Sequence, residues 1–475
     1  MEKFKKTKIV CTIGPATANY DMIYQLAQRG MNIVRFNFSH DTHESHKERM
    51  NLVRKVSEDS GFVLSIMVDT KGPEIRVGEI ENGEVQFKTG DEVEIYRDQI
   101  VGTHKGFSLS APEVFDDVSA GDTILIDDGK MRLTVLANEK NGVLQARVEN
   151  FGVIKTRKGV NVPNVHISQA FISEKDDADI RFACRNGADF IAASFVRRKE
   201  DIFEIRKILE EENKPRMQII AKIENQESYE NIEEILEAAD GVMVARGDLG
   251  VEVSTALVPI YQKKIIQKAN NHGKPVITAT HMLESMMSNP RPTRAEASDV
   301  ANAIIDGTDA IMTSGETAVG AYPLEAVETM NTIALAMENI IPYRDNLQHQ
   351  VQTAQTTIQD SIGISVADTS INLEEVEAIV AFTQGGSTAR RISKYRPPVP
   401  IFAVTFTHEV ERSLNANWGV FPVFSDIQNN MHNDDELASI IAKNYGIEPG
   451  KFVIITAGYP TGEGTANMMK IIEVK

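Results

Sequence analysis

Lys222 and Glu224 stand in the segment AKIENQE, and Asp248 stands in the segment VARGDLGVE, both near the middle of the sequence. The carboxylates of Glu224 and Asp248 would suit a hard divalent ion, and because no histidine or thiolate ligand accompanies them, Mg²⁺ or Mn²⁺ is more natural than zinc. Lys222 lies two residues before Glu224 and would lie beside such an ion. With Arg35 and Arg76 as further cations, this set could stabilise the charge on a transferring phosphoryl group. A structural network of salt bridges among the same residues is the alternative.

Alternating strands and helices would position these residues. Short β-branched runs predict strands at residues 8–14, 32–39, 62–70, 190–196, 217–224, 241–248, 275–282 and 310–316. Amphipathic runs between them predict helices, for example at 21–30, 198–213 and 255–273, with a last helix at 323–339. Such strand and helix units in succession are typical of an α/β protein built as a parallel (β/α)8 TIM barrel.

Polar residues gather at the predicted ends of these strands. In the second strand Arg35, Asn37 and Ser39 share one face and the apolar residues between them share the other, because side chains alternate along a strand. Other polar residues at strand ends are Asp69, Thr70, Lys222, Glu224, Arg246, Asp248, Thr278, Thr280, Ser314 and Glu316. Barrel enzymes keep their catalytic residues at the carboxyl ends of the strands, so we expect the active site here. A single threonine or serine in this set could instead be a capping residue.

Two further domains are predicted beside a barrel made of residues 1–71 and 170–344. Residues 72–169 show period-two alternation broken by Asn-Gly and Asp-Gly turns, which predicts a small all-β domain inserted after the third strand, where it could act as a lid. A Gln-rich linker, DNLQHQVQTAQTTIQD, follows the barrel. Residues 345–475 then carry strands of their own, at 377–383, 400–406, 451–457 and 467–474, and predict a C-terminal α/β domain.

Charge and composition limit the partners of the protein. The formal net charge of −18 repels nucleic acid and anionic membranes, so an anionic ligand must be held by a local cluster of cations. No segment approaches the roughly 18 apolar residues of a membrane span, and the N-terminus lacks the apolar run of a signal peptide. The sequence has two cysteines, Cys11 and Cys184, which we expect to be buried thiols in a reducing compartment. We therefore expect a cytoplasmic protein that acts on small molecules.

Three histidines lie close together in RFNFSHDTHESH, a spacing that first suggests a transition-metal site. The second strand is expected to end near Ser39, which places His40 at the barrel mouth and His43 and His46 in the following helix. One metal ion could not easily be coordinated by all three histidines. We therefore expect the side chains of His43 and His46 to take part in helix packing or to face solvent. The sequence also lacks the G-x-x-x-x-G-K-[ST] and G-x-G-x-x-G nucleotide motifs.

A series of segments resembles the pyruvate kinase family. In order they are CTIGPAT, MNIVRFNFSH, DTKGPEIR, KGVNVP, AKIENQE, VARGDLGVE, ATHMLESM, PTRAEASDVANA and MTSGETAVG. The resemblance covers essentially the whole chain, including the inserted and C-terminal domains. It implies that the protein transfers the phosphoryl group of phosphoenolpyruvate to ADP in glycolysis, giving ATP and an enolpyruvate that is then protonated to pyruvate.

The resemblance also implies roles for individual residues. Lys222 would stabilise the transferring group, and Glu224 and Asp248 would hold the divalent ion. The substrate carboxylate would be bound by the backbone at Gly247 and Asp248 and by Thr280. Thr280 would also help to deliver the proton to the enolpyruvate, with water as the ultimate donor. Arg35 would bind phosphate and contribute to catalysis. The nucleotide side would consist of Asn37, His40, Arg76 and Lys158, and the β domain that carries Lys158 would close over it.

A monovalent-cation site is implied as well. It would consist of Asn37, Ser39, Asp69 and Thr70, an all-oxygen cluster with one net charge that suits K⁺. Glu74 in KGPEIR matches potassium-dependent members, whereas a lysine there goes with independence, so we predict activation by K⁺. One departure is His281, which stands where the family usually has glutamine. If strand alternation continued, His281 would point away from Thr280 and would act indirectly.

The C-terminal domain contains a second candidate site, in AFTQGGSTARRISKYRP. A strand, a glycine turn and a helix that carries Arg390, Arg391 and Lys394 would suit a phosphate group; an N-capped surface helix is the alternative. In the family the equivalent turn binds an activating sugar phosphate, often fructose 1,6-bisphosphate. The residues concerned are Thr383, Gln384, Gly385, Gly386, Ser387 and Thr388. The resemblance also implies a homotetramer, and we expect no counterpart to the extra C-terminal domain of some bacterial members.

Two other functions stay open at this point. A metal-dependent aldolase or lyase acting on a pyruvate-like acid would use the carboxylates and a divalent ion, but it would not need Lys222, the cation site or the lid. A catalytically silent regulatory relative is disfavoured by the presence of Lys222, Glu224 and Asp248.

Overall fold

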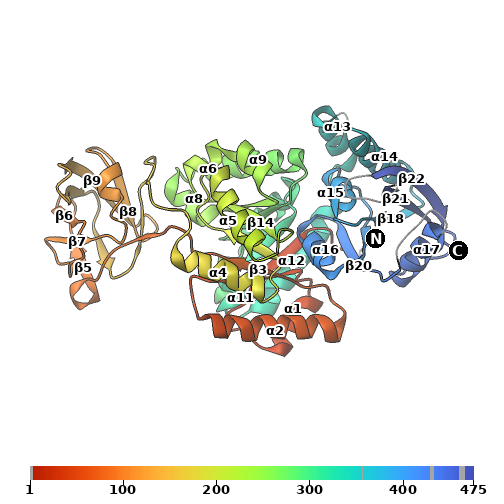
Figure 1. Cartoon of the computed structure of the whole chain (residues 1–475), viewed down its shortest axis with the longest axis horizontal. Helices are drawn as coiled ribbons and strands as arrows, with labels where there is room; N and C mark the ends of the chain where they lie inside the picture. The colour runs from red at the N-terminus through yellow and green to blue at the C-terminus, as the bar shows by residue number, and fades with distance from the viewer. Residues whose placement is uncertain (1–3, 356, 428–432, 459–465) are drawn as a thin grey trace.

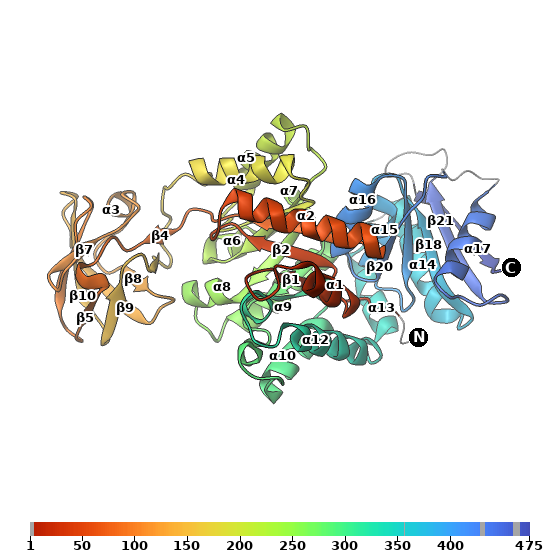
Figure 2. The same ribbon diagram turned by 90° about the horizontal axis from the view of Figure 1, so that it is seen from below.

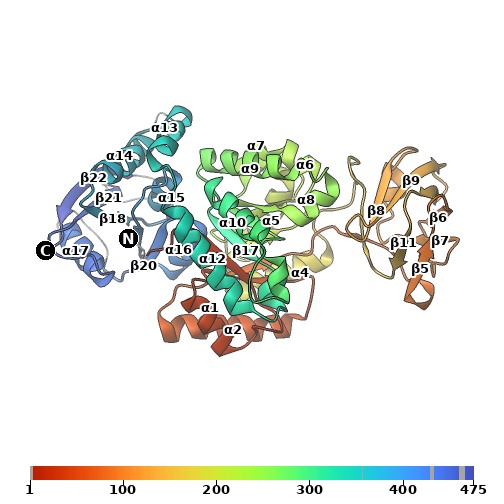
Figure 3. The ribbon, with the colours of Figure 1, turned by 180° about the vertical axis from the view of Figure 1, so that it is seen from behind.

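Three units follow one another along the longest axis of the protein. The computed structural model describes residues 4–355, 357–427, 433–458 and 466–475. The barrel lies in the middle, with the inserted β unit (orange) at one end and the C-terminal unit (blue) at the other (Figure 1). The same order is seen from below and from behind (Figures 2 and 3). The inserted and C-terminal units therefore lie on opposite sides of the barrel.

Eight parallel strands close into the barrel. They are β1 (Lys8–Thr12), β2 (Ile33–Asn37), β3 (Ser65–Asp69), β13 (Phe190–Ala193), β14 (Gln218–Ile223), β15 (Gly241–Ala245), β16 (Val276–Ala279) and β17 (Ala310–Thr313). β1 pairs with β2 on one side and with β17 on the other, which closes the sheet. Apolar side chains such as Val10, Ile220 and Met243 fill the interior. The predicted TIM barrel is confirmed.

Helices surround the barrel. They are α1 (Tyr20–Gln28), α2 (His43–Ser60), α4 (Glu174–Arg185), α5 (Lys199–Glu211), α6 (Gln226–Glu230), α7 (Ile232–Ala238), α8 (Arg246–Glu252), α9 (Val258–His272), η2 (Glu284–Met287), α10 (Arg294–Ile305), α11 (Gly315–Ala318) and α12 (Pro323–Glu338). Local chemistry sets several of their ends: Ser173 and Thr293 begin α4 and α10 with capping boxes, and Gly61 and Gly273 end α2 and α9 in the left-handed conformation. Within the described residues, no helix is long and apolar enough to cross a membrane.

The inserted unit is built from short strands around its own apolar core, which includes Phe87, Phe107 and Leu133. Its elements are β4 (Ile75–Arg76), η1 (Glu81–Gly83), β5 (Glu84–Phe87), β6 (Glu92–Tyr96), β7 (Gly106–Ser108), α3 (Val114–Asp117), β8 (Thr123–Ile126), β9 (Met131–Asn138), β10 (Val143–Val148), β11 (Gly152–Lys155) and β12 (Gly159–Asn161). One sheet has the order β4-β12-β8-β9-β10-β6-β7, and β11 pairs with β5. Two chain connections join this unit to the carboxyl end of the barrel (Figure 1).

The C-terminal unit is a five-stranded sheet in the order β20-β19-β18-β21-β22. Its strands are β18 (Val376–Phe382), β19 (Ile401–Thr405), β20 (Val420–Phe424), β21 (Phe452–Gly458) and β22 (Ala466–Glu473). Its helices are α13 (Tyr343–Thr353), α14 (Ile358–Asn372), α15 (Ser387–Lys394), α16 (His408–Ser413), η3 (Leu414–Ala416) and α17 (Asp434–Asn444). The helices α15 and α16 lie on the side that faces the barrel (Figures 1 and 3).

Two sequence predictions for this unit were wrong. The Gln-rich segment is not a linker, because α13 and the start of α14 occupy most of it, and the buried side chain of Leu347 packs against Ala367 and Tyr395. The strand β20 was missed because Pro422 lies within it, and proline argues against a central strand. β20 lies at the edge of the sheet, where a missing N–H group is tolerated.

Candidate active site

Lys222 is held in a cluster of oxygen atoms near the end of β14. Its Nζ atom donates to Asp69 Oδ1 at 3.1 Å and to Ser194 Oγ at 2.7 Å, and it lies 2.9 Å from Glu224 Oε1. Burial lowers the pKa of Lys222, but nearby carboxylates, chiefly that of Asp69, outweigh burial and raise the pKa above its ordinary value. The side chain is therefore a fixed cation at neutral pH.

Glu224 directly follows β14 and is buried. Its Oε2 atom accepts the backbone N–H of Phe195 at 2.6 Å, and Phe195 adopts the unusual left-handed conformation, with φ of 57°, that aims this donor at the carboxylate. Burial raises the pKa of Glu224, Lys222 opposes this shift and Asp248 adds to it, which brings the pKa to about 7. A buried carboxylate whose charge is disfavoured by a second carboxylate nearby fits a divalent cation, which would relieve the repulsion.

Asp248 reaches this cluster from a helix. The prediction that it lies at the end of a strand was wrong. β15 ends at Ala245, and Asp248 lies in the first turn of α8 (Arg246–Glu252). The strand alternation used for Arg246 and Asp248 therefore does not apply. Arg246 instead holds neighbouring loops together: its Nη2 atom lies 2.7 Å from Asp299 Oδ2 and donates to the carbonyl oxygen of Thr280 at 2.7 Å.

Thr280 lies beyond the end of β16, so alternation also fails for the pair Thr280 and His281. Both residues have positive φ angles, 65° and 53°. The N–H of Gly247 donates to Thr280 Oγ1 at 2.8 Å, which brings together two of the residues predicted to receive the substrate carboxylate. The imidazole of His281 lies beside Gly247, since a Cβ atom placed on that glycine would be 3.4 Å from His281 Cε1. Strand parity therefore does not direct His281 away from Thr280, and its indirect role stays a prediction.

Arg35 on β2 is buried with its charge paired. Its Nε atom donates to Asp69 Oδ2 at 2.6 Å, and its Nη1 atom donates to Thr12 Oγ1 at 2.8 Å. Burial alone would raise the pKa of Asp69, but the cations of Arg35 and Lys222 outweigh it and lower that pKa below its ordinary value. Asp69 thus stands between two cations and fixes the position of both.

The four residues of the predicted monovalent-cation site lie at the ends of β2 and β3. Asn37 and Asp69 are register partners on these strands. Asn37 Oδ1 accepts the N–H of Ser39 at 3.0 Å, and the carbonyl oxygen of Thr70 accepts from Ser194 Oγ at 2.7 Å. Side-chain and backbone oxygens of this kind are the ligands that hard cations take.

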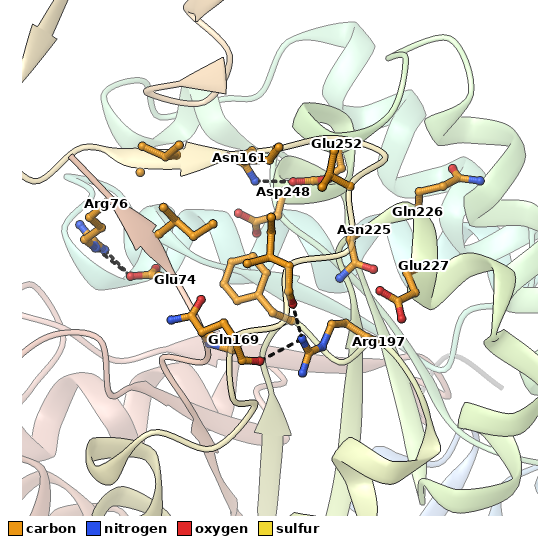
Figure 4. A pocket seen from close by; sticks show the side chains of 18 of the residues that line it. Glu74, Arg76, Asn161, Gln169, Arg197, Asn225, Gln226, Glu227, Asp248 and Glu252 are labelled. Atoms are coloured by element: carbon orange, nitrogen blue, oxygen red, sulfur yellow. Dashed lines mark hydrogen bonds and ion pairs between the residues drawn. The ribbon is translucent and has the colours of Figure 1, made fainter. Parts of the chain in front are cut away.

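A cavity of about 800 Å³ lies between the barrel and the inserted unit (Figure 4). Three of the predicted nucleotide-binding residues, His40, Arg76 and Lys158, line it. Arg76 is paired with Glu74 at 2.6 Å, and Lys158 lies 2.7 Å from Asp127 Oδ1. Asp248 and Phe195 also line the cavity and connect it to the cluster around Lys222.

The wall of this cavity crosses from one unit to the other. Asn161 of the inserted unit donates to Glu252 Oε1 of α8 at 2.7 Å (Figure 4). On the barrel side Arg197 donates to the carbonyl oxygens of Ile167 and Gln169, each at 3.1 Å. These contacts fix the second connection of the inserted unit against the barrel.

Two of the three histidines of RFNFSHDTHESH, His43 and His46, are engaged in packing, whereas His40 lines the cavity. His46 stacks on Phe38 with ring centroids 4.1 Å apart, and burial lowers its pKa. His43 stacks on Phe182 at 4.3 Å, and its Nε2 atom lies 2.6 Å from Asp179 Oδ1. Among the described residues, no cluster of three or more His, Cys, Asp or Glu side chains could hold a metal ion, and Cys11 and Cys184 are buried and unpaired. The assignment of His43 and His46 to packing is confirmed.

Ser194 and Thr12 were missed by the sequence analysis. Ser194 follows β13 directly, and its hydroxyl bridges Lys222, Asp69 and Thr70. Thr12 ends β1 and accepts from Arg35 while donating to the carbonyl oxygen of Thr313 at 2.9 Å. Both are polar residues at strand ends, so the signal used for the other residues could have found them.

The glycine turn of the C-terminal unit lies between β18 and α15. Gly386 has a φ of 86° and caps α15. Thr383 is buried, and its Oγ1 atom has no hydrogen-bond partner among the described residues. Arg391 Nη1 lies 2.7 Å from Asp360 Oδ2, so its charge is balanced from α14. The structure thus brings the predicted effector residues together in one turn at a helix N-terminus.

Comparison with known proteins gives consistent results. The model of the family described as "Pyruvate kinase, barrel domain" matches residues 4–327, and that of "Pyruvate kinase, alpha/beta domain" matches residues 360–472. The chain is 52% identical over 470 residues to the pyruvate kinase of Geobacillus stearothermophilus, an alignment that covers 98% of this chain and 80% of that protein. The pyruvate kinase of Staphylococcus aureus (strain MRSA252) is 50% identical over 474 residues, with the same coverage.

A solved structure agrees with these sequence matches. A crystal structure of a pyruvate kinase from Cryptosporidium parvum superimposes with a TM-score of 0.95 and 37% sequence identity, covering 99% of this chain and 96% of that one. Sequence, barrel, inserted unit and C-terminal sheet therefore lead to one conclusion: the chain belongs to the pyruvate kinase family and is a phosphotransferase.

Proposed function

We propose that the cluster around Lys222 transfers the phosphoryl group of phosphoenolpyruvate to ADP, giving pyruvate and ATP. The observation that carries this assignment is the position of the Lys222 ammonium group, which lies among Asp69, Ser194 and Glu224 at the mouth of a barrel. A cation fixed in a buried site stabilises charge on a transferring phosphoryl group without reorganising at the moment of reaction.

Each neighbouring residue has a role in this proposal. Arg35 is oriented by Asp69 and Thr12, so its guanidinium can bind the phosphate of the substrate. The substrate carboxylate would be received by Gly247, Asp248 and Thr280, and it would replace the Thr280 hydroxyl as the acceptor for the N–H of Gly247. Thr280 Oγ1 would then be near the carbon that is protonated, with water as the ultimate proton source.

A divalent cation is implied by membership of the family, and we propose Mg²⁺ or Mn²⁺ held by Glu224 and Asp248. The all-oxygen donor set and the raised pKa of Glu224 fit such an ion. When bound, it would neutralise charge on the phosphate and carboxylate groups of the substrates. For the monovalent ion we propose K⁺, with Asn37, Ser39, Asp69 and Thr70 as its ligands.

The cavity between the barrel and the inserted unit would bind the nucleotide. Its volume of about 800 Å³ is within the range of small-molecule sites. Asn37, His40, Arg76 and Lys158 would contact the nucleotide, and the phosphates would compete with Glu74 and Asp127 for the two cations paired with them. The inserted unit, residues 72–169 in our proposed division of the chain, would act as the lid.

Regulation and assembly complete the proposal. We assign the turn from Thr383 to Thr388 to an activating sugar phosphate such as fructose 1,6-bisphosphate. The assignment is based on the helix N-terminus and on the buried Thr383 hydroxyl, which has no hydrogen-bond partner within the described part of the chain. We further propose a homotetramer, as is usual in the family, and a cytoplasmic location, where the substrates of glycolysis are found.

The experiment that tests the proposed reaction is a pyruvate-release assay. Pyruvate should form from phosphoenolpyruvate only when ADP and Mg²⁺ or Mn²⁺ are present, faster with K⁺, and with ATP produced in equal amount. Pyruvate formed without ADP would support an aldolase or lyase instead. Absence of pyruvate under all conditions, from a protein that is folded by circular dichroism, would support a catalytically silent relative.

A further inference from the structure

Arg390, on the helix that follows the glycine turn, joins three separate parts of the protein. Its Nη1 atom donates to the carbonyl oxygen of Gly385 in the turn at 3.0 Å. Its Nη2 atom donates to Ser413 Oγ, at the end of α16, at 2.9 Å and to Gln218 Oε1 of the barrel at 3.3 Å. All three acceptors are neutral. One rigid guanidinium group therefore connects the turn, the helix α16 and the barrel.

The barrel contact lies on the strand that carries the catalytic lysine. Gln218 is the first residue of β14, and Lys222 lies near the other end of the same strand. β14 pairs with β13 on one side and β15 on the other. Gln218 pairs with Phe190 of β13, and the pairing with β15 begins two residues later at Ile220, so a displacement of Gln218 would be passed to β13 and along β14.

The contact with Ser413 leads to the base of the same barrel. Ser413 is followed by η3, and Ala416 of η3 packs with Val10, Ile33 and Ile220 in the barrel interior. Asn415 Nδ2 donates to the carbonyl oxygens of Asn32 and Val63, at 3.1 and 2.7 Å. The segment after Ser413 thus closes the end of the barrel that lies opposite the active site.

The turn and Arg390 are tightly fitted to each other. A Cβ atom added to Gly386 would lie 2.8 Å from Arg390 Nη1, and the φ of Gly386 is 86°, which side chains disfavour. Burial lowers the pKa of Arg390, in keeping with a charge that no carboxylate contacts directly among the described residues. A phosphate bound in the turn would attract this guanidinium and change its hold on Gly385.

We propose that Arg390 couples occupancy of the turn to the active site, through its hydrogen bonds to Gln218 and Ser413. This inference rests on the proposed effector function of the turn. Arg390 and Gln218 are positioning residues, since neither lies at the catalytic cluster. A ligand in the turn would shift Arg390, and the shift would be transmitted to β14 and to the segment that closes the barrel base.

Gln218→Met is the sharpest test, because it keeps the length of the side chain and removes the acceptor without altering the turn. Fructose 1,6-bisphosphate binding is measured by calorimetry, and the half-saturating phosphoenolpyruvate concentration is measured with and without it. In the unaltered protein we expect that concentration to fall about fivefold or more on activation. The Gln218→Met variant should bind the sugar phosphate normally, keep its activity without effector, and lose most of this change.

A matched control separates this route from a general loosening of the domain interface. Arg412 also joins the C-terminal unit to the barrel, by donating to Asp189 Oδ1 at 2.7 Å, but its interactions do not include the turn. Arg412→Met should therefore keep the full activation. Arg390→Met should bind the sugar phosphate more weakly, because its guanidinium contacts the turn. At saturating sugar phosphate it should lose the activation as Gln218→Met does, and the double variant should be no worse than either alone. Thermal unfolding checks that each variant is folded.

The outcomes distinguish the two proposals. Full activation in Arg390→Met at saturating sugar phosphate overturns the coupling role of Arg390, and full activation in Gln218→Met overturns the route through β14. Either result leaves the effector site standing. Equal loss of activation in Arg412→Met also overturns the specific role of Arg390, because the loss of any contact between the C-terminal unit and the barrel would then abolish activation. If the unaltered protein neither binds nor responds to fructose 1,6-bisphosphate or to other sugar phosphates, the proposed effector function fails and the coupling fails with it.

Discussion

The ammonium group of Lys222 and the carboxylate of Glu224 lie 2.9 Å apart at the end of one strand, and they act on each other's pKa in opposite directions. Lys222 is kept charged by the carboxylates around it. Glu224 has its pKa raised by burial even with Lys222 beside it. The pair combines a permanent cation with a carboxylate that needs a further positive charge, and the proposed chemistry and metal requirement follow from this.

Replacing Lys222 by methionine should reduce kcat by at least about 10² to 10³-fold, the usual effect of removing one group that stabilises transition-state charge. The half-saturating ADP concentration should change little, because the nucleotide cavity is lined by other residues. Steady-state pyruvate release gives both values. Lys207→Met, at an exposed position on α5, is the matched control and should be fully active. A Lys222→Met variant with near-normal kcat would contradict the role of the cation.

Ser194→Ala should lower kcat by about tenfold, since one hydrogen bond that positions a charged group is lost. Its hydroxyl accepts from Lys222 and donates to Asp69 Oδ1 and the carbonyl oxygen of Thr70. Threonine at this position keeps the hydroxyl and should restore part of the loss. Equal kcat values for the alanine and threonine variants would show that the hydroxyl does not position Lys222.

Glu224→Gln should abolish Mn²⁺ binding measured by electron paramagnetic resonance on the protein without substrates. Without metal, the same substitution should stabilise the protein against urea at pH 8. The sign follows from the pKa of Glu224, which is about 7 in the folded protein and 4.5 ordinarily. Because this pKa is raised, protonated Glu224 favours the folded state below pH 4.5, and this contribution to stability is lost as the pH rises through 7. At pH 8 the buried charge therefore destabilises the protein, and its removal is favourable. Unchanged Mn²⁺ binding in Glu224→Gln would exclude this residue as a ligand.

Ser39→Ala should raise the K⁺ concentration needed for half-maximal activity several-fold, because one proposed oxygen ligand is removed. Its effect on the maximal rate at saturating K⁺ should be small. Ser45→Ala, in the first turn of α2, removes a hydroxyl outside the cluster and serves as the control. Activity that is equal with K⁺ and with a large inert cation would rule out the site altogether.

Asp360→Asn should destabilise the C-terminal unit at pH 7 by about 1–3 kcal/mol, because Arg391 and the hydroxyl of Tyr395 lose a charged partner. Burial would raise the pKa of Asp360, but hydrogen bonds from Tyr395 and Thr357 and the nearby cations outweigh it and lower that pKa. The stability from this carboxylate is present above its ordinary pKa of 3.8 and is lost as the pH falls through the lower folded value. Urea unfolding of both proteins at pH 7 and pH 3 should show the difference shrinking with acidity.

The order of strands and helices could be predicted from the sequence because it depends on local patterns. Short β-branched runs that alternate with amphipathic runs predicted the eight barrel strands, and period-two alternation broken by turn residues predicted the inserted unit. The helix α13 and the strand β20 could not be predicted in this way. The polar helix α13 is held by the buried side chain of Leu347, which packs against Ala367 and Tyr395. Pro422 is tolerated in β20 because this strand lies at the edge of the sheet. Both facts depend on neighbours that are distant in the sequence.

By itself the sequence determined which residues stand at the ends of strands, and so which side chains could meet: Arg35, Asp69, Lys222 and Glu224 were found in this way. Tertiary structure decided how they meet. Asp248 comes from a helix, Thr280 and His281 lie in left-handed conformations, and Ser194 bridges β14 and β3. Alternation is a property of extended backbone and ends where the strand ends, whereas loop geometry and shared hydrogen bonds are set by contacts between segments far apart in the chain.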